Sequence, residues 1–390
     1  GTGKTQTNSN KIRDCLEQGI SPDRIACVSF TRKAAQESRQ RVCKDWGIDE
    51  RDMPYFQTLH SMAFRAGGYS TDEVIGAKDM DEVGDAVGIP FGKKNRSDIE
   101  SDFDTLGVAK GDFYMSQYHL CRSKGLTLEE MHRQLADYQV DWCELKRLIS
   151  AYEDYKSVRK KIDFTDMIDN FIKSNDGPNI EALFVDEAQD LSTLQWSMVN
   201  VLREKPRIQV FTGDDDQAIM GFQGADVEAF LNATEKKTVL EQSYRLPRSV
   251  WQEAQNIVCR IEGRAPKTWR PKDEEGLVQF HQNIWDVPLD AGEWCIMART
   301  NRIASQYAQV LREEGWVYSR NGHPSIPAKT YEALDDWEKW SRGEPLTPSK
   351  LRNVYTFMNM GEGYSRGFGP RSSALTGLEA EAEISMSEAT

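Results

Sequence analysis

The chain opens with Gly-Thr-Gly-Lys-Thr, which fits the end of a phosphate-binding loop. Such a loop reads G-x-x-x-x-G-K-[ST]: backbone N–H groups at a helix N-terminus cradle phosphate oxygens, the lysine neutralises them, and the hydroxyl holds Mg²⁺. Gly3, Lys4 and Thr5 match its end, and the pattern's first glycine would precede Gly1. A Gly-Thr-Gly turn before an ordinary helix would look the same, so both interpretations stay open here.

A second stretch with residues suited to phosphate chemistry is Leu-Phe-Val-Asp-Glu-Ala-Gln-Asp, residues 183–190. An apolar strand would deliver Asp186 and Glu187 at its carboxyl end. Asp186 can hold Mg²⁺, directly or through water, and Glu187 can orient or deprotonate an attacking water. Alone, such a pair is more often a helix N-cap. Combined with the loop at Lys4, and with a parallel sheet to bring strand ends together, it favours a nucleotide site.

Hydrophobic patterning indicates the elements that would position these groups. Short apolar strands separated by helical stretches imply a parallel sheet covered on both faces. We expect helices over residues 4–18 and 32–46, and strands ending at Phe30 and over 181–187, 207–214 and 236–242. Residues 65–160 are polar and helical in pattern, which is typical of an insertion into the sheet domain.

A second alternation begins near Gly276 and predicts a second α/β domain. We expect strands at 276–281 and 293–300, an amphipathic helix over 301–315, and a strand with a turn at 316–322. Beyond Pro345 the pattern weakens.

Composition allows a multidomain globular protein. Three hundred and ninety residues exceed one ordinary core, and 39% hydrophobic with 28% charged residues is normal. No apolar run approaches the ~20 residues that span a bilayer, and seven scattered cysteines indicate reduced thiols of a cytosolic protein. The net charge of −13 argues mildly against nucleic acid. Basic tracks at 29–44 and 155–161 could still bind phosphates, although such a track alone is more often a solvated helix face.

Six blocks between Gly1 and Pro247 resemble, in order and spacing, the superfamily-one DNA helicases of the UvrD/Rep/PcrA type. The blocks are GTGKT, VSFTRKAAQESRQRV, TLHSMAFR, FVDEAQD, FTGDDDQAIMGFQGAD and LEQSYRLP. The resemblance implies a P-loop NTPase (RecA-like) α/β fold. It assigns 1–64 and 161–245 to a first motor domain, 65–160 to a helical inserted subdomain, 246–340 to the start of a second RecA-like domain, and 341–390 to an incomplete further segment.

The resemblance also implies roles in binding ATP and Mg²⁺. Glu187 would be the catalytic base, Gln217 the sensor of the γ-phosphate, and Arg245 the arginine that reaches this phosphate, where charge develops. Tyr244 would stack on adenine. Gly1, Thr2, Gly3, Lys4 and Thr5 would form the phosphate loop, with Thr5 and Asp186 as metal ligands.

For DNA, the resemblance implies a grip formed by the loop after the second strand, by the TLHS block and by the segment that follows the sensor glutamine. Aromatic stacking on bases, with hydroxyl and basic groups on phosphates, holds single strands largely independently of sequence. The implied residues are Phe30, Thr31, Arg32, Thr58, His60 and Phe222. Met220 and Gln223 stand where relatives commonly have tyrosine and arginine, so one contact to DNA or nucleotide is expected to be weaker.

These observations predict an ATP-driven translocase that moves on single-stranded DNA, 3′ to 5′ by resemblance, and unwinds duplex. Expected partners are single-stranded DNA, duplex/single-strand junctions and replication or repair proteins, in the cytoplasm or at the nucleoid, with no membrane. The family's last two motifs and the start of the phosphate loop have no equivalent, so we expect a portion of a longer helicase. The alternatives are a nucleotide-switched DNA- or protein-binding module without unwinding, and an inactive fragment.

Overall fold

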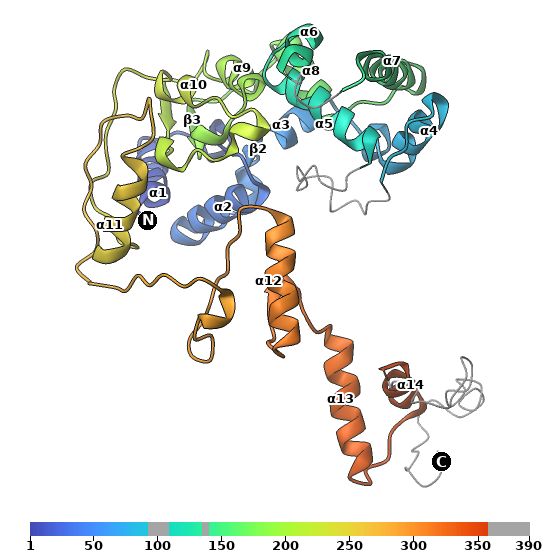
Figure 1. The fold of residues 1–390 in the computed structure, drawn as a ribbon. Helices are drawn as coiled ribbons and strands as arrows, with labels where there is room; N and C mark the ends of the chain where they lie inside the picture. The colour runs from blue at the N-terminus through green and yellow to red at the C-terminus, as the bar shows by residue number, and fades with distance from the viewer. Residues whose placement is uncertain (93–108, 135–139, 358–390) are drawn as a thin grey trace. The chain divides into compact units, whose positions relative to one another are not determined.

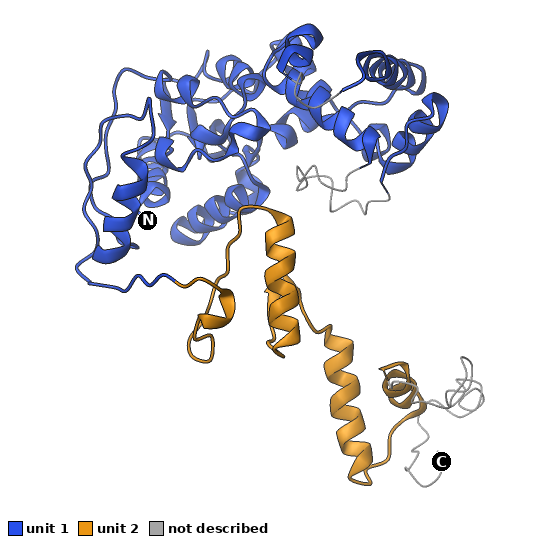
Figure 2. Cartoon of the chain, in the orientation of Figure 1, with its two compact units in different colours: residues 1–280 blue, residues 281–390 orange. Residues whose placement is uncertain are grey.

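A computed structural model describes residues 1–92, 109–134 and 140–357 (Figure 1). The chain divides into two compact units, Gly1–Phe280 and His281–Thr390 (Figure 2). The first unit contains a four-stranded parallel sheet in the order β2-β1-β3-β4. Its strands are β1 (Ile25–Ser29), β2 (Phe56–Thr58), β3 (Ala182–Asp186) and β4 (Ile208–Phe211). This confirms the predicted α/β class with a parallel sheet.

The register aligns the carboxyl ends of three strands. Ser29 at the end of β1 lies opposite both Thr58, the last residue of β2, and Asp186, the last residue of β3. Parallel strands that end level with one another present the loops that follow them at one edge of the sheet. The segments beginning at Phe30, Leu59 and Glu187 therefore share this edge.

Helices cover both faces of the sheet. Successive residues of a strand point to opposite faces, so each strand contributes to two hydrophobic cores. Ala26, Val28, Leu183 and Val185 face one hydrophobic core, while Ile25, Cys27, Ala182 and Phe184 face another. The first core includes residues of α3 (Leu59–Ala66), α8 (Phe164–Ser174) and α9 (Thr193–Leu202), and the second includes residues of α1 (Lys4–Glu17) and α2 (Arg32–Trp46). The first unit also contains α10 (Val227–Leu231) and α11 (Arg248–Val258).

The segment predicted as an insertion has a hydrophobic core of its own. Buried residues such as Val83, Tyr114, Met131, Leu148 and Tyr152 form it. They lie on α4 (Ala77–Val87), α5 (Lys110–Ser123), α6 (Leu128–Gln134) and α7 (Trp142–Arg159). The described residues of this segment form helices and turns without a named strand. A separate core supports the proposed inserted subdomain, whose boundaries remain a prediction.

A cluster of ion pairs joins α8 to α5 and α7. Arg122 donates to Asp163 at 3.0 Å and to Asp166 and Asp169 at 2.7 Å each. Lys156 donates to Asp163 at 2.9 Å and to Asp166 at 2.8 Å. Each cation offsets part of the cost of burying these carboxylates. The two helices of the inserted segment are thus fixed to α8 by charge as well as by packing.

Acidic residues offset part of the charge of the basic track at 155–161. Lys156 is buried in the ion-pair cluster. Arg159 pairs with Glu82 at 3.5 Å and Lys161 with Asp79 at 3.4 Å. Acidic residues distant in the sequence offset this charge, and a local count of lysines and arginines cannot show that.

Three predicted strands do not form. Residues 236–242, 276–281 and 293–300 carry no named strand. Gln242 makes only an isolated bridge to Arg270. Leu277, Phe280 and Met297 are exposed. An apolar segment becomes a strand only when a neighbouring strand accepts its hydrogen bonds, and among the described residues these segments have no strand pairing beyond that single bridge. The assignment of 246–340 to a second motor domain stays a prediction.

The second unit is helical in its described part. It contains α12 (Asn301–Glu313), the short strands β5 (Ser319–Arg320) and β6 (His323–Pro324), α13 (Ala328–Ser341) and α14 (Pro348–Phe357). The two strands form an antiparallel hairpin through Asn321 and Gly322, both with positive φ, as a two-residue turn requires. Trp340, Leu346, Leu351 and Val354 form a small core. Among the described residues of the whole chain, none of the helices combines the length and apolar character needed to cross a bilayer.

Candidate nucleotide site

The amino-terminal loop leads directly into a helix. Gly3 has φ 85° and caps α1, which begins at Lys4. A helix start offers unpaired backbone N–H groups and a partial positive charge, and both favour phosphate. Lys4 Nζ donates to Glu187 Oε2 at 3.3 Å, although the two residues are 183 positions apart. The structure thus brings the loop and the acidic pair together, and half-buried Thr5 is in the same first turn.

Asp186 is held at the end of β3 by a short chain of hydrogen bonds. Thr212 Oγ1 donates to Asp186 Oδ1 at 2.8 Å, and Asn8 Nδ2 donates to Thr212 Oγ1 at 2.8 Å. Asn8 lies one turn beyond Lys4 on α1, so it faces the same side of the helix. Burial raises the pKa of Asp186, and the Thr212 hydrogen bond acts in the opposite direction. The carboxylate is therefore fixed beside the start of α1.

The residues present fit a magnesium-bound nucleotide. Mg²⁺ in such sites is usually held by one or two carboxylates together with waters and substrate phosphates. Asp186 and the hydroxyl of Thr5, which follows Lys4 in the sequence, would be the donors available for such a site. No cluster of three or more potential metal-ligating side chains occurs within the described ranges.

Glu187 adopts a left-handed backbone conformation, with φ 50° and ψ 44°. Gln189, which is fully buried, stabilises the loop: its Nε2 donates to Glu187 Oε2 at 3.1 Å and to Asp190 Oδ2 at 3.2 Å. Its Oε1 accepts from the backbone N–H of Asp214 at 3.1 Å. A non-glycine residue in this conformation stores strain that the surroundings must offset. The sequence reasoning missed Gln189, although it stands inside the FVDEAQD block.

The turn after β4 carries the predicted sensor. Gln217 is exposed, and its Nε2 donates to a carboxylate oxygen of Asp214. Gly213 precedes this turn and lies against Gln189, so that a Cβ there would be 2.6 Å from Gln189 Oε1. Gln189 therefore contacts both the acidic loop and the sensor turn.

Tyr244 and Arg245 lie at the start of the phosphate loop. The backbone N–H of Tyr244 donates to the carbonyl of Gly1 at 2.9 Å. A Cβ built on Gly1 would be 2.3 Å from Cβ of Arg245. Both side chains are exposed, Tyr244 to 73%. The structure therefore brings both residues to the loop formed by Gly1, half-buried Thr2 and Gly3, while their roles toward nucleotide stay predictions.

The residues predicted to grip DNA have two kinds of environment. Thr31 and Thr58 cap α2 and α3, since their hydroxyl oxygens accept backbone N–H groups at 3.2 Å. Arg32 is exposed at the start of α2, while Phe30 is partly buried against the core. All four lie at the shared carboxyl edge of the sheet. Helix capping alone is thus sufficient to explain why these two positions are threonine.

His60 and Phe222 differ in exposure. The His60 ring meets Phe164 edge-on at 5.8 Å. Burial, with a smaller contribution from the charge of Arg32, lowers the pKa of His60 to about 4, so the ring is neutral at pH 7. Phe222 is 52% exposed in the turn that follows the sensor glutamine.

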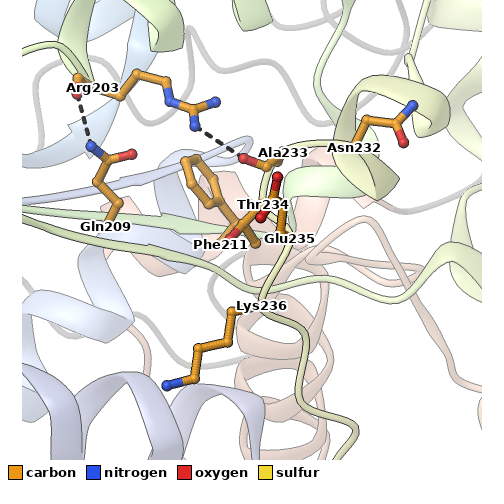
Figure 3. A pocket seen from close by; sticks show the side chains of 8 residues that line it. All are labelled: Arg203, Gln209, Phe211, Asn232, Ala233, Thr234, Glu235 and Lys236. Carbon is orange, nitrogen blue, oxygen red and sulfur yellow. Dashed lines mark hydrogen bonds between the residues drawn. The ribbon is translucent and has the colours of Figure 1, made fainter.

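A separate pocket of about 460 Å³ lies beside β4 (Figure 3). Arg203 crosses it and donates to the carbonyl of Ala233 at 3.0 Å, and its guanidinium lies 5.3 Å from the ring centre of Phe211. None of the predicted site residues lines this pocket. Its lining is Arg203, Gln209, Phe211, Asn232, Ala233, Thr234, Glu235 and Lys236.

Comparison with known proteins agrees with this geometry. Residues 1–238 match the family described as UvrD/REP helicase N-terminal domain. The chain belongs to this family. Among curated UvrD/REP-type relatives, the ATP-dependent DNA helicase PcrA of Staphylococcus aureus strain Mu50 is 26% identical over 304 residues, which cover 72% of this chain and 40% of the relative. The ATP-dependent DNA helicase PcrA of Staphylococcus epidermidis is 24% identical over 355 residues, 85% of this chain and 46% of the relative. The chain thus spans less than half the length of these relatives.

Proposed function

We propose that this UvrD/REP-family protein hydrolyses ATP with Mg²⁺ to move along single-stranded DNA and unwind duplex, with the 3′ to 5′ polarity that the resemblance implies. The observation that carries the proposal is the meeting of Lys4 with Glu187, beside Asp186. A phosphate-loop lysine, a metal-binding carboxylate and a catalytic base must converge for phosphoryl transfer to water. We propose DNA junctions and repair or replication proteins as partners.

In this proposal each residue has a defined task. The N–H groups at the start of α1 and the ammonium of Lys4 bind phosphate oxygens, while Asp186 and Thr5 would hold Mg²⁺. The metal would neutralise developing charge on the phosphates. Glu187 would leave Lys4 when nucleotide binds and accept a proton from the attacking water. Gln217 and Arg245 would face the terminal phosphate, and Tyr244 the base.

Hydrolysis in the complete protein tests the nucleotide site. Lys4→Ala and Glu187→Gln should each lower ATP turnover stimulated by single-stranded DNA by about a hundredfold or more, because each removes a charge or base needed in the transition state. Lys11→Ala is the matched control, since Lys11 is exposed on the same helix. Unchanged turnover in a folded Lys4→Ala or Glu187→Gln protein would refute the assignment.

Strand displacement tests the motor. The proposed translocase separates a labelled duplex with a single-stranded tail in an ATP-dependent reaction, whereas a nucleotide-switched binding module would bind the tail without displacement. Phe222→Ala should weaken binding to the tail, because base–aromatic stacking contributes about 1–3 kcal/mol per base. ATP-dependent binding without displacement by the complete protein would favour the switched module.

A further inference from the structure

The sensor turn has a concentration of negative charge that the nucleotide mechanism does not by itself explain. Asp214, Asp215 and Asp216 immediately precede Gln217. The carboxylates of Asp215 and Asp216 are largely buried. Three adjacent carboxylates repel one another and would repel a triphosphate nearby. Some other part of the chain must compensate for them.

Residues 264–267, which follow α11, supply this compensation. Lys267 Nζ contacts all three carboxylates: Asp214 at 2.7 Å, Asp216 at 3.2 Å, and Asp215. Arg264 binds Asp216 through two nitrogens, at 2.8 and 2.6 Å. This two-point contact fixes orientation as well as charge.

The backbone also takes part, since Ala265 N–H donates to Asp215 Oδ2 at 2.7 Å. Burial opposes ionisation of Asp216, but hydrogen bonds from Arg264 and Lys267 outweigh it and lower the pKa of this carboxyl. Asp216 is therefore held as a carboxylate, and the turn is fixed at several points by one short segment.

The continuation of this segment, Arg270 and Pro271, contacts residues 241–243, which directly precede Tyr244 and Arg245. Ser243 N–H donates to the carbonyl of Arg270 at 2.8 Å, and Arg270 N–H donates to the carbonyl of Glu241 at 2.6 Å. Gln242 Nε2 donates to the carbonyl of Pro271 at 2.9 Å. Residues 264–271 thus join the sensor turn to the stretch that carries the predicted adenine-stacking and arginine residues.

We propose that Lys267 and Arg264 are positioning residues of the nucleotide site, which hold the aspartate turn and, through Asp214, orient the side chain of Gln217. Asp214 accepts from both Lys267 and the Gln217 amide. The position of Asp214 therefore determines whether the amide nitrogen or the amide oxygen of Gln217 faces a bound nucleotide. This inference rests on the proposed ATPase function.

The test uses the complete protein and separates turnover from binding. Lys267→Met should lower kcat for ATP about ten- to hundredfold, the usual effect of removing a residue that orients a direct contact, and leave the affinity for ADP unchanged. Preference for a non-hydrolysable ATP analogue over ADP should fall, because the γ-phosphate sensor is displaced. Lys267→Arg should retain most activity. Lys272→Met is the matched control, since Lys272 pairs with Glu274 in the next part of the chain.

A double-mutant cycle identifies the route of the effect. If Lys267 acts through the sensor, Lys267→Met has little further effect on kcat in a Gln217→Ala background. Arg264→Gln provides a second single variant should Lys267→Met fold poorly. Parental turnover in folded Lys267→Met and Arg264→Gln, or fully multiplicative effects with Gln217→Ala, would overturn the inference. A parental protein without ATP turnover would instead refute the proposed function.

Discussion

Removal of the Lys156 ammonium should destabilise the junction between α7 and α8. Lys156 is 4% exposed, and its Nζ lies 2.9 Å from Asp163, 2.8 Å from Asp166 and 2.9 Å from Glu153. The ammonium also lies 4.7 Å from the ring centre of Tyr152. Lys156→Met keeps most of the side-chain volume and removes the charge together with its hydrogen bonds to Asp163 and Asp166, so the expected effect is electrostatic and polar, not a loss of packing.

The expected loss of stability depends on how well the buried carboxylates are still compensated after the substitution. Removing one partner of a buried ion pair costs about 3–5 kcal/mol, because the other charge is left buried without compensation. Here Arg122 still contacts Asp163 and Asp166, at 3.0 and 2.7 Å, and offsets part of this cost. We therefore expect a loss of about 2–3 kcal/mol, which corresponds to a decrease in Tm of about 5–10 °C for a unit of this size.

Calorimetry of the chain with and without the substitution measures this decrease. Lys110→Met is the matched control, because Lys110 pairs with Glu144 on the surface of the same inserted segment. An exposed pair contributes about 0–1 kcal/mol, so the control should melt close to the parental chain. A Lys156→Met chain that melts at the parental temperature would show that the ion-pair cluster does not contribute to stability and would refute the reasoning.

Two further predictions concern the edge of the sheet. The pKa of His60 is about 4 in the folded protein and about 6.5 in the unfolded chain. As the pH falls through 6.5, the unfolded state therefore takes up a proton that the folded state does not, and the free energy of unfolding decreases. Between pH 7.5 and 5.5 the parental chain should lose about 1 kcal/mol more stability than His60→Gln, measured as urea midpoints at both pH values, and equal pH slopes would contradict this. Gly213→Ala places a Cβ 2.6 Å from Gln189 Oε1 and 2.7 Å from Phe230, so it should cost about 1–3 kcal/mol and lower ATP turnover. Gly221→Ala is the control, because no atom lies within 4 Å of the added Cβ. Equal melting temperatures for Gly213→Ala and Gly221→Ala would contradict this prediction.

The fold could be predicted where its cause is local. The helices beginning at Lys4 and Arg32 show helical periodicity in their own residues, and β3 is a short apolar run that ends in acidic residues. The strands predicted at 236–242, 276–281 and 293–300 had similar apolar character but did not form. A strand depends on a neighbour, and the residues of one segment do not say whether a neighbour is present.

The sequence predicted the motifs of the candidate site but not most of the side-chain contacts that join them. The motifs around Lys4 and Glu187 predicted a contact that the structure contains. The bridging role of Gln189 and the pairing of Lys267 with Asp214 were not foreseen. The second pair joins residues 53 positions apart, and each residue alone is typical of a solvated surface. Such contacts follow from the fold and not from a short pattern.

The open side of β4 has a practical consequence for work on the purified chain. β4 is a terminal strand of its sheet and pairs only with β3 among the described strands. A strand without an outer neighbour is a template onto which another extended polypeptide can add by backbone hydrogen bonding. A dilution series with the purified chain measures whether a second copy adds at this strand, and it belongs with every measurement of turnover.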